Sequence, residues 1–503
     1  MLLLFHAGIF FLTSSSAQVS LQIDPAFSTN MVLQRNKPIT VWGKGNPGTS
    51  VSVSFHGDKI TGKIKTDSTW LLVLKSQPAN GSPATLLVTA GIDSVTVQNI
   101  LVGDVWLCIG QSNMEWPLIN EQFFSEEKSE RAPPNLRIYN PVYAGKNIYA
   151  KPYTDSVLAS LNTTRFYQGC WEECDSNSRK NMSAVSYYFG KEIITRTGVP
   201  VGLINLSIGG APLETFIDIR ALQQNKQFAT KVTGNWLKNN SIPVWVRDRG
   251  EQNVGALPNV ISDEMGKNHA YKPGFAYASG IHPRINLPIC GIICYQGESN
   301  AQEMARVEEY GRLTALMVQD YRNKWKNPSL PFYFVQLSSI DTTSYKSQLW
   351  PEFRNEQRKM LAYIPRTGMA VTSDIGALND VHPTNKREVG KRLARWALLN
   401  EYKQKQIVSG PLPTVAKYTA GKVIIQFQYV GSSLKTNNND PVAGFSIPDS
   451  KIKSAKIAGS KVILTVDHKT KPKLVYYSWQ PYATGNLINS EGLPASTFKI
   501  SIR

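Results

Sequence analysis

The stretch ILVGDVWLCIGQSNM, residues 100–114, decides the fold of this 503-residue chain. Its first part is mostly apolar, which is typical of a strand buried on both faces of a sheet. That strand leads directly into Gly110, Gln111, Ser112 and Asn113. A hydroxyl that follows a buried strand lies at the edge of a sheet, where open α/β sheets bind their ligands.

The same pattern recurs along the chain. The segments VGLINLSIGG (201–210), CGIICYQG (290–297), PFYFVQLSS (331–339) and RTGMAVTSDIG (366–376) each predict a strand. Amphipathic segments between them predict helices, among them AVSYYFGKEIITRTG (184–198). Apolar strands that alternate with helices predict an α/β fold, with a parallel sheet that helices cover on both faces.

The regions on either side of this centre have a different rhythm. Short β-rich segments separated by turns fill residues 18–99 and 404–503, which predicts a β-sandwich-like domain at each end. The central domain then spans residues 100–403 and carries a small insertion at about 215–280. Residues 114–183 are rich in aromatic residues, Asn and Pro, and we expect them to be loop-like.

The chain begins with an apolar run that ends in small residues, MLLLFHAGIFFLTSSSA (1–17). Ser15 and Ala17 fit the pattern of a signal-peptidase site, which predicts an exported protein, periplasmic or extracellular, that starts at Gln18. No later segment has the roughly 18 consecutive apolar residues that a membrane helix needs. We therefore expect no membrane span.

The charge and the cysteines say little about partners. There are 55 Lys and Arg against 37 Asp and Glu, a formal net charge of +18, but they are scattered rather than gathered in a run. The charge therefore does not indicate a nucleic-acid partner. The five cysteines are too few for a disulfide scaffold, and a local bridge between Cys170 and Cys174 stays open. The sequence carries no signal for the oligomeric state.

Four blocks with reactive or hydrogen-bonding groups each follow a predicted strand. They contain Ser112 in GQSNM, Gly210 in SIGG, Asn300 in QGESNA, and the pair Asp380 and His382 in DVHP. Each of the first three blocks alone is compatible with an ordinary turn. Parallel strands bring their carboxyl ends to one edge of a sheet, so the four blocks together predict a single site.

In this order the blocks resemble the signature blocks of SGNH (GDSL-like) hydrolases, and more closely those of the sialate O-acetylesterase family within them. The segments MVLQRNKPITVWG (31–43), NMSAVSYYFGKEI (181–193) and NLINSEGLPASTF (486–498) share this resemblance, which covers nearly the whole mature chain. It implies a three-layer α/β/α, flavodoxin-like sheet. The D-x-H spacing of Asp380 and His382 resembles this branch rather than the D-x-x-H of many SGNH enzymes.

The resemblance implies a serine esterase. Ser112 would attack an acetyl carbonyl, His382 would take its proton, and Asp380 would hold the imidazole, with Asp374 as a rival for that role. The N–H groups of Ser112 and Gly210 and the side chain of Asn300 would form the oxyanion hole.

Gln111, Gln296 and Glu298 are further candidates for substrate binding, and the scheme requires no metal or organic cofactor. The implied substrate is an O-acetylated sialic acid, with acetylated xylan or another acetylated carbohydrate as the alternative. A different class of function, a non-catalytic carbohydrate-binding protein, is compatible with the two β domains. Such a protein has no need of an intact serine, histidine and aspartate.

Overall fold

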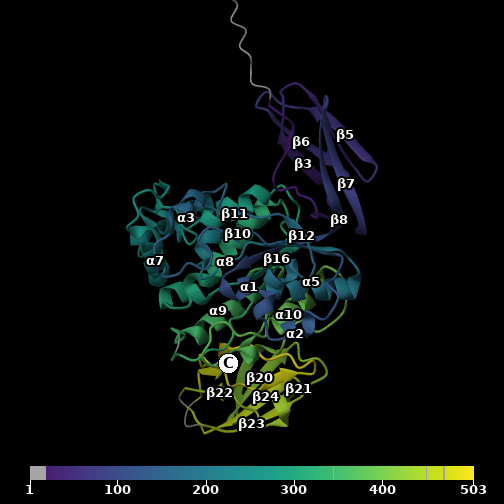
Figure 1. Ribbon diagram of the computed structural model, residues 1–503. Coiled ribbons are helices and arrows are strands. Elements are labelled where there is room, and N and C mark those ends of the chain that lie inside the picture. Colours follow the sequence, from purple (N-terminus) through teal and green to yellow (C-terminus); the bar gives the residue numbers. More distant parts are fainter. Residues whose placement is uncertain (1–18, 344, 449, 468–470) are drawn as a thin grey trace, which may run out of the picture.

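The structure is a computed structural model that describes residues 19–343, 345–448, 450–467 and 471–503 (Figure 1). The expected signal peptide, residues 1–17, lies outside these ranges. Within them, no helix combines the length and the apolar character needed to cross a membrane. Figure 1 shows the N-terminal strands at one end of the molecule, the mixed α/β region in the middle and the C-terminal strands at the other end.

The N-terminal region consists of short, mostly antiparallel strands. Strands β1, β3 and β6 form one sheet, and the remaining strands join a larger sheet that includes β8. In β4 the apolar residues Val51, Val53 and Phe55 are buried and the serines between them are not, which is the alternation that a sheet with one core-facing side requires. The strands are β1 Gln22–Ile23, β2 Val32–Gln34, β3 Ile39–Lys44, β4 Ser50–Phe55, β5 Asp58–Lys63, β6 Thr69–Leu74, β7 Asn80–Ala90 and β8 Asp93–Gly110.

Strand β8 connects this region to the centre of the molecule. It is 18 residues long, and its first part pairs with β7 and β2 of the N-terminal region. Its last part lies between β13 and β16 of the central sheet. The boundary that we expect between residues 99 and 100 therefore falls inside one continuous strand, and buried residues of both regions belong to one hydrophobic core.

The central sheet has six parallel strands in the order β9-β13-β8-β16-β17-β18, with β12 antiparallel at the β9 edge. The run β13-β8-β16-β17-β18 follows the 2-1-3-4-5 order of one class of doubly wound folds. The prediction of a mixed α/β protein is confirmed. The strands are β9 Leu136–Tyr139, β12 Trp171–Glu173, β13 Val201–Asn205, β16 Gly291–Tyr295, β17 Phe332–Val335 and β18 Thr367–Ala370.

Helices pack on this sheet in two groups. Helices α5 and α10 contact each other, and the Trp106 ring of β8 lies 4.9 Å from Phe189 of α5. Helices α8 and α9 form the second pair. From β8 the sheet extends to β13 on one side and to β16, β17 and β18 on the other. Helix α5 belongs to the connection on the β13 side, and α8 and α9 belong to the connections on the other side. Because crossovers between parallel strands are right-handed, α5 and the α8–α9 pair lie on opposite faces of the sheet. The helices are α1 Ser112–Glu115, α2 Phe124–Glu127, α3 Asp155–Ser160, α4 Ser178–Asn181, α5 Ala184–Thr197, α6 Ile219–Gln224, α7 Val244–Gly250, α8 Met304–Lys324, α9 Trp350–Tyr363 and α10 Lys386–Asn400.

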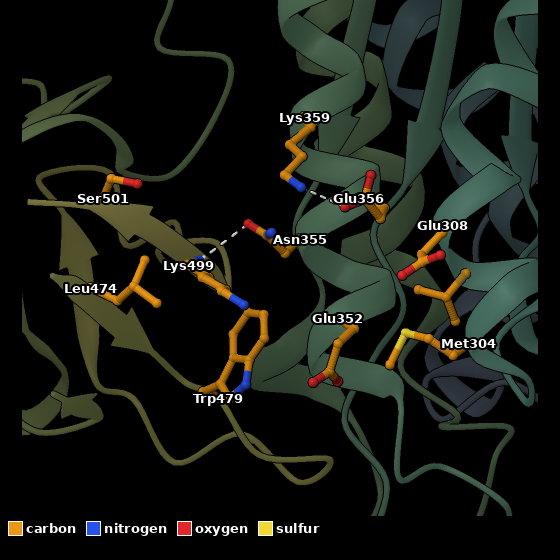
Figure 2. Close-up of a pocket in the computed structure, with 11 residues that line it drawn as sticks. Met304, Glu308, Glu352, Asn355, Glu356, Lys359, Leu474, Trp479, Lys499 and Ser501 are labelled. Carbon is orange, nitrogen blue, oxygen red and sulfur yellow. Dashed lines mark hydrogen bonds and ion pairs between the residues drawn. The ribbon is translucent and has the colours of Figure 1, made fainter. Parts of the chain in front are cut away.

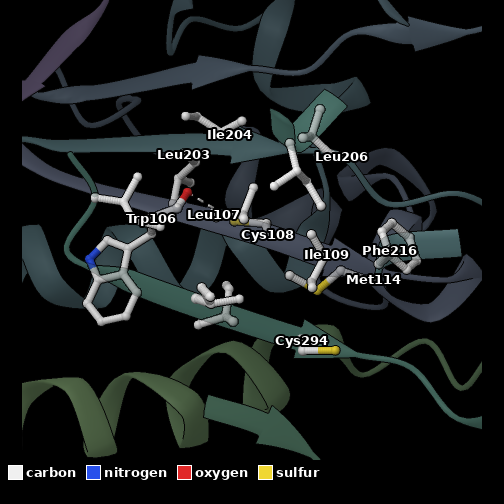
Figure 3. Packing of buried hydrophobic residues seen from close by; sticks show 14 of the residues in the cluster. Trp106, Leu107, Cys108, Ile109, Met114, Leu203, Ile204, Leu206, Phe216 and Cys294 are labelled. Atoms are coloured by element: carbon white, nitrogen blue, oxygen red, sulfur yellow. Dashed lines mark hydrogen bonds between the residues drawn. The ribbon is translucent and has the colours of Figure 1, made fainter. Parts of the chain in front are cut away.

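The core around β8 is filled by apolar side chains from β8, β13 and β16 (Figure 3). Cys108 and Cys294 are part of this packing, and burial raises the pKa of the Cys108 thiol to about 12. All five cysteines are unpaired, including Cys170 and Cys174, between which the sequence left a local bridge open. The buried thiols of Cys108, Cys174 and Cys294 act as small apolar groups, whereas Cys170 is exposed.

Residues 114–183 contain more regular structure than the loop-like stretch that we expect from their composition. They supply β9 and β12 to the central sheet and a separate pair, β10 Val142–Tyr143 and β11 Tyr167–Gln168. These strands have two to four residues, too few for an alternating pattern to show in the sequence. The insertion at about 215–280 contains α6, α7 and the pair β14 Ser262–Asp263 and β15 Gly266–Lys267.

The C-terminal region has several small sheets and a hydrophobic core of its own. A groove of about 500 Å³ separates it from α8 and α9, with Trp479 and Lys499 on one side and Glu352 and Lys359 on the other (Figure 2). None of the four sequence blocks contributes to the lining of this groove. The strands are β19 Leu412–Thr419, β20 Lys422–Gln428, β21 Leu434–Thr436, β22 Phe445–Ser446, β23 Ile452–Ala458, β24 Lys461–Val466, β25 Leu474–Tyr477, β26 Leu487–Asn489 and β27 Phe498–Ser501.

Candidate active site

The serine of the first block and the histidine of the fourth block meet at the carboxyl end of the central sheet. Strand β8 ends at Gly110, whose φ of +143° and close approach to the carbonyl of Tyr295 exclude a side chain there. The chain then turns into α1, which begins at Ser112. The Oγ of Ser112 and Nε2 of His382 are hydrogen-bonded at 2.8 Å, a distance at which an imidazole can accept the proton of a serine hydroxyl.

Asp380 and Trp116 hold the imidazole of His382. The Oδ1 atom of Asp380 accepts the backbone N–H of His382 at 2.8 Å and lies 3.6 Å from the Nδ1 of the ring. The indole of Trp116 stacks on the imidazole with 5.3 Å between ring centres. Asp374, the rival for the orienting role, instead pairs with both terminal nitrogens of Arg392 at 2.6 and 2.7 Å. Asp380 is therefore the carboxylate beside the histidine.

The surroundings keep the imidazole neutral. Burial lowers the pKa of His382 below its usual range, and the positive charge of Lys386 lowers it further, while Asp380 raises it. Only the neutral ring can accept a proton at Nε2, so the lowered pKa favours the proton-accepting form of His382 at neutral pH.

A buried polar cluster adjoins Ser112 and His382 along the chain. Two of its members, Asn113 and Lys386, were not among the candidates from the sequence. Asn113 donates one hydrogen bond to Glu298 at 2.5 Å and one to the carbonyl of Val381 at 2.9 Å, and it accepts one from Lys386. Burial raises the pKa of Glu298 to about 7 and lowers that of Lys386 to about 7. Because Val381 precedes His382, this cluster fixes the loop that carries the base.

The glycine block follows β13 and lies beside the end of β8, where the N–H of Ile208 donates to the carbonyl of Gly110 at 3.0 Å. Gly210 has a φ of +73°, and a Cβ atom there would lie 2.3 Å from the hydroxyl of Tyr271. The carbonyl of Gly209 accepts a hydrogen bond from Tyr271 at 2.6 Å, and that of Gly210 accepts one from Ser299 at 2.8 Å. Among the described residues, no acceptor is bonded to the N–H of Ser112 or of Gly210. Both donors are free for an oxyanion.

Asn300 is fixed by contacts on both ends of its amide. Its Oδ1 accepts from the N–H of Leu213 at 3.1 Å and from Gln296 at 2.8 Å. Its Nδ2 donates to the buried Glu214 at 3.0 Å, and Glu214 pairs with Lys231 at 2.7 Å. Among the described residues, nothing accepts the second amide hydrogen of Asn300, so this group can donate to a ligand.

The other three candidates from the sequence are buried in the interior. The Oε1 of Gln111 lies within 3.4 Å of three donors, the N–H groups of Gly297 and Ser299 and the side chain of Gln296. Glu298 bonds to Asn113, as described above. These contacts join the first and third blocks to each other. No group of three or more His, Cys, Asp or Glu side chains converges as a metal site would require, within the ranges that the structure describes.

Several known proteins are similar to this chain in sequence or in structure. Residues 266–399 match the family model described as "Carbohydrate esterase, sialic acid-specific acetylesterase". The chain is 27% identical over 445 residues to a sialate O-acetylesterase of Homo sapiens. This alignment covers 82% of this chain and 77% of that protein. It is also 27% identical over 447 residues to the Mus musculus protein of the same name, and this alignment covers 83% of this chain and 80% of that protein. A solved carbohydrate acetylesterase from Xanthomonas citri has 30% identity and a TM-score of 0.77, over 95% of this chain and 99% of that chain.

Proposed function

Because the chain belongs to the sialate O-acetylesterase family and is a carboxylic ester hydrolase, we propose that it removes O-acetyl groups from sialic acids by a serine mechanism. The observation that carries the proposal is the 2.8 Å hydrogen bond between Ser112 and a histidine whose pKa is lowered. A merely structural serine has no need of a neutral base at this distance.

In the first half of the reaction, Ser112 Oγ attacks the acetyl carbonyl while His382 Nε2 takes the hydroxyl proton. The imidazolium that forms is stabilised by the Asp380 carboxylate, 3.6 Å from Nδ1. His382 then gives the proton to the departing sugar oxygen, which leaves as the alcohol, and the acetyl group remains on Ser112.

In the second half, a water molecule attacks the acetyl-enzyme. His382 takes a proton from this water and returns it to Ser112, so that acetate leaves and the free enzyme is restored. Both halves pass through a tetrahedral oxyanion. The free N–H groups of Ser112 and Gly210 and the free amide hydrogen of Asn300 stabilise it, and one such donor contributes about 3 kcal/mol.

We assign Gln111, Gln296 and Glu298 to positioning rather than to substrate contact. Their side chains are nearly inaccessible to solvent, and their hydrogen bonds link the blocks that carry the serine and the asparagine. A donor in an oxyanion hole is effective only when it is held in place before the reaction. These buried bonds supply that rigidity.

The test is acetate release from 9-O-acetylated sialic acid by the wild type and by Ser112→Ala, with acetylated xylan as a parallel substrate. We expect turnover of the sialic acid by the wild type and a loss on the order of 10⁴-fold or more in Ser112→Ala. Full turnover by that variant contradicts the serine mechanism. If only acetylated xylan is hydrolysed, the substrate is the neutral polysaccharide and not a sialic acid. If neither substrate is hydrolysed, the result favours a non-catalytic carbohydrate-binding protein.

A further inference from the structure

Helix α7 of the insertion brings two side chains next to the glycine block. The Cζ2 atom of Trp245 lies 3.1 Å from the position that a Cβ on Gly210 would occupy. The guanidinium carbon of Arg249, one turn further along α7, lies 5.2 Å from the centre of the Trp245 ring. Arg249 is therefore one indole ring away from a proposed oxyanion donor.

A tyrosine on the other side completes this arrangement. The ring of Tyr149 lies 5.4 Å from the Arg249 guanidinium, and its hydroxyl lies 2.7 Å from where a Cβ on Gly209 would be. The guanidinium thus contacts two aromatic rings, each of which also approaches the glycine block. Aromatic rings attract a guanidinium but accept none of its in-plane hydrogen bonds.

The donors of this cluster have no acceptors. Nε and Nη1 of Arg249 and Nε1 of Trp245 are buried, and no described residue accepts a hydrogen bond from them. Most buried donors in proteins are paired, because an unpaired one loses its bond to water without replacement. Three unpaired donors lie in this one cluster, and a partner that has only acceptors would satisfy them.

The nearby acidic residue is already neutralised. The Glu115 carboxylate at the end of α1 pairs with Lys146 at 3.0 Å and accepts a hydrogen bond from Tyr143 at 3.1 Å. The charges of Lys146 and Glu115 cancel, and no carboxylate of the described residues forms an ion pair with Arg249. The cluster is thus both rich in donors and positively charged, and this combination favours an anion.

We infer that Arg249 and Trp245 form a subsite for the carboxylate of an acidic sugar, next to the oxyanion hole. The planar fork of a guanidinium matches a carboxylate, and the indole N–H supplies a further donor. The distance of one ring from Gly210 to the guanidinium fits a single monosaccharide that carries the ester and the carboxylate at opposite ends. The inference rests on the proposed function and adds the determinant of its specificity.

The test compares 9-O-acetylated sialic acid with the same ester whose C1 carboxylate is replaced by the carboxamide. Acetate release reports both reactions. The wild type is expected to favour the acid in kcat/KM by about 10- to 100-fold, the range for a hydrogen bond to a charged group. Arg249→Gln should reduce kcat/KM on the acid by a similar factor, mainly through KM, so that the ratio of acid to amide approaches one.

A matched control is Arg220→Gln in α6 of the same insertion. It makes the same change of charge, but the Arg220 side chain is 68% exposed. We expect it to keep the wild-type ratio of acid to amide. If Arg249→Gln does not fold, Trp245→Phe keeps an aromatic ring beside Arg249 and removes the Nε1 donor together with the rest of the pyrrole ring. It should lower the ratio several-fold while the thermal unfolding midpoint stays close to that of the wild type.

Three results overturn the inference. Equal hydrolysis of acid and amide by the wild type removes the carboxylate subsite but leaves the proposed sialate esterase intact. An equal loss on both substrates in Arg249→Gln makes the arginine a structural residue. Hydrolysis of acetylated xylan with neither sialic acid derivative removes the proposed substrate and the subsite together.

Discussion

At the scale of single residues, two charges act on His382 in opposite directions. Lys386 lowers the pKa of the imidazole and Asp380 raises it. In the proposed mechanism the neutral ring is the base, so the acid limb of the pH profile of kcat/KM reports this pKa, and activity falls as the pH drops through it.

Lys386→Met removes the charge that lowers the pKa, so its acid limb should move to higher pH. Asp380→Asn removes the charge that raises the pKa, so its limb should move to lower pH, with kcat reduced because the imidazolium loses its carboxylate. The measurement is kcat/KM between about pH 4 and 9 on a neutral acetyl ester. Shifts of both variants in the same direction would contradict the assignment of the two charges.

The sequence predicts those site residues that lie in short blocks at strand ends. Ser112 and His382 can be predicted from the sequence because the carboxyl ends of parallel strands lie at one edge of the sheet. Lys386 lies four residues after His382 and could have been found from that spacing, which places both near the start of α10. Arg249 could not have been found from the sequence. The folding of the insertion brings it near Gly210, and no local sequence pattern indicates that proximity.

At the scale of elements, helix α5 shows how a local signal sets a boundary. Its N-cap Ser183 accepts a hydrogen bond from the N–H of Ser186 at 3.1 Å. Its C-cap Gly198 has a φ of +71°, the left-handed conformation that a glycine adopts without cost. The sequence predicts this helix over 184–198 with its end at Gly198, and the helix forms where the pattern predicts it. By contrast, β9 and β12 are too short to carry a pattern and form because the edge of the sheet beside β13 accepts them.

Gly198→Ala should destabilise the protein by about 1 kcal/mol, because alanine is strained at positive φ. No heavy atom lies within 4 Å of the added methyl group, so the loss isolates the backbone effect. Urea denaturation gives the change in the free energy of unfolding. Gly198 precedes β13 at the amino ends of the strands, so kcat/KM should stay unchanged. A stability equal to that of the wild type would show that the helix end rearranges.

At the scale of the whole molecule, the C-terminal region has its own core but is tied to the centre by α9. The fully buried Arg354 of α9 donates to the carbonyls of Gln480 at 2.5 Å and Pro481 at 2.8 Å. Burial lowers its pKa to about 9. The Arg354 guanidinium therefore supplies hydrogen bonds to two carbonyls of the C-terminal region in place of water.

Arg354→Met keeps the length of the side chain but leaves both carbonyls without this donor. We expect a loss of about 2–4 kcal/mol and, in calorimetry, a separate transition of the C-terminal region at lower temperature. Lys359→Met on the same helix is the control, because the Lys359 side chain is 48% exposed and should matter little. A single unshifted transition in Arg354→Met would show that other contacts couple the two regions.

The continuity of β8 limits how this protein can evolve. Its N-terminal half belongs to one region and its C-terminal end positions Ser112, so the two regions cannot be exchanged as independent modules. A recombination that replaces the N-terminal strands must also supply a strand of the right length. One inserted residue within it would turn every following side chain to the other face of the sheet. Selection on the position of Ser112 therefore also constrains the codons for the N-terminal half of β8, whose residues lie in another region of the protein.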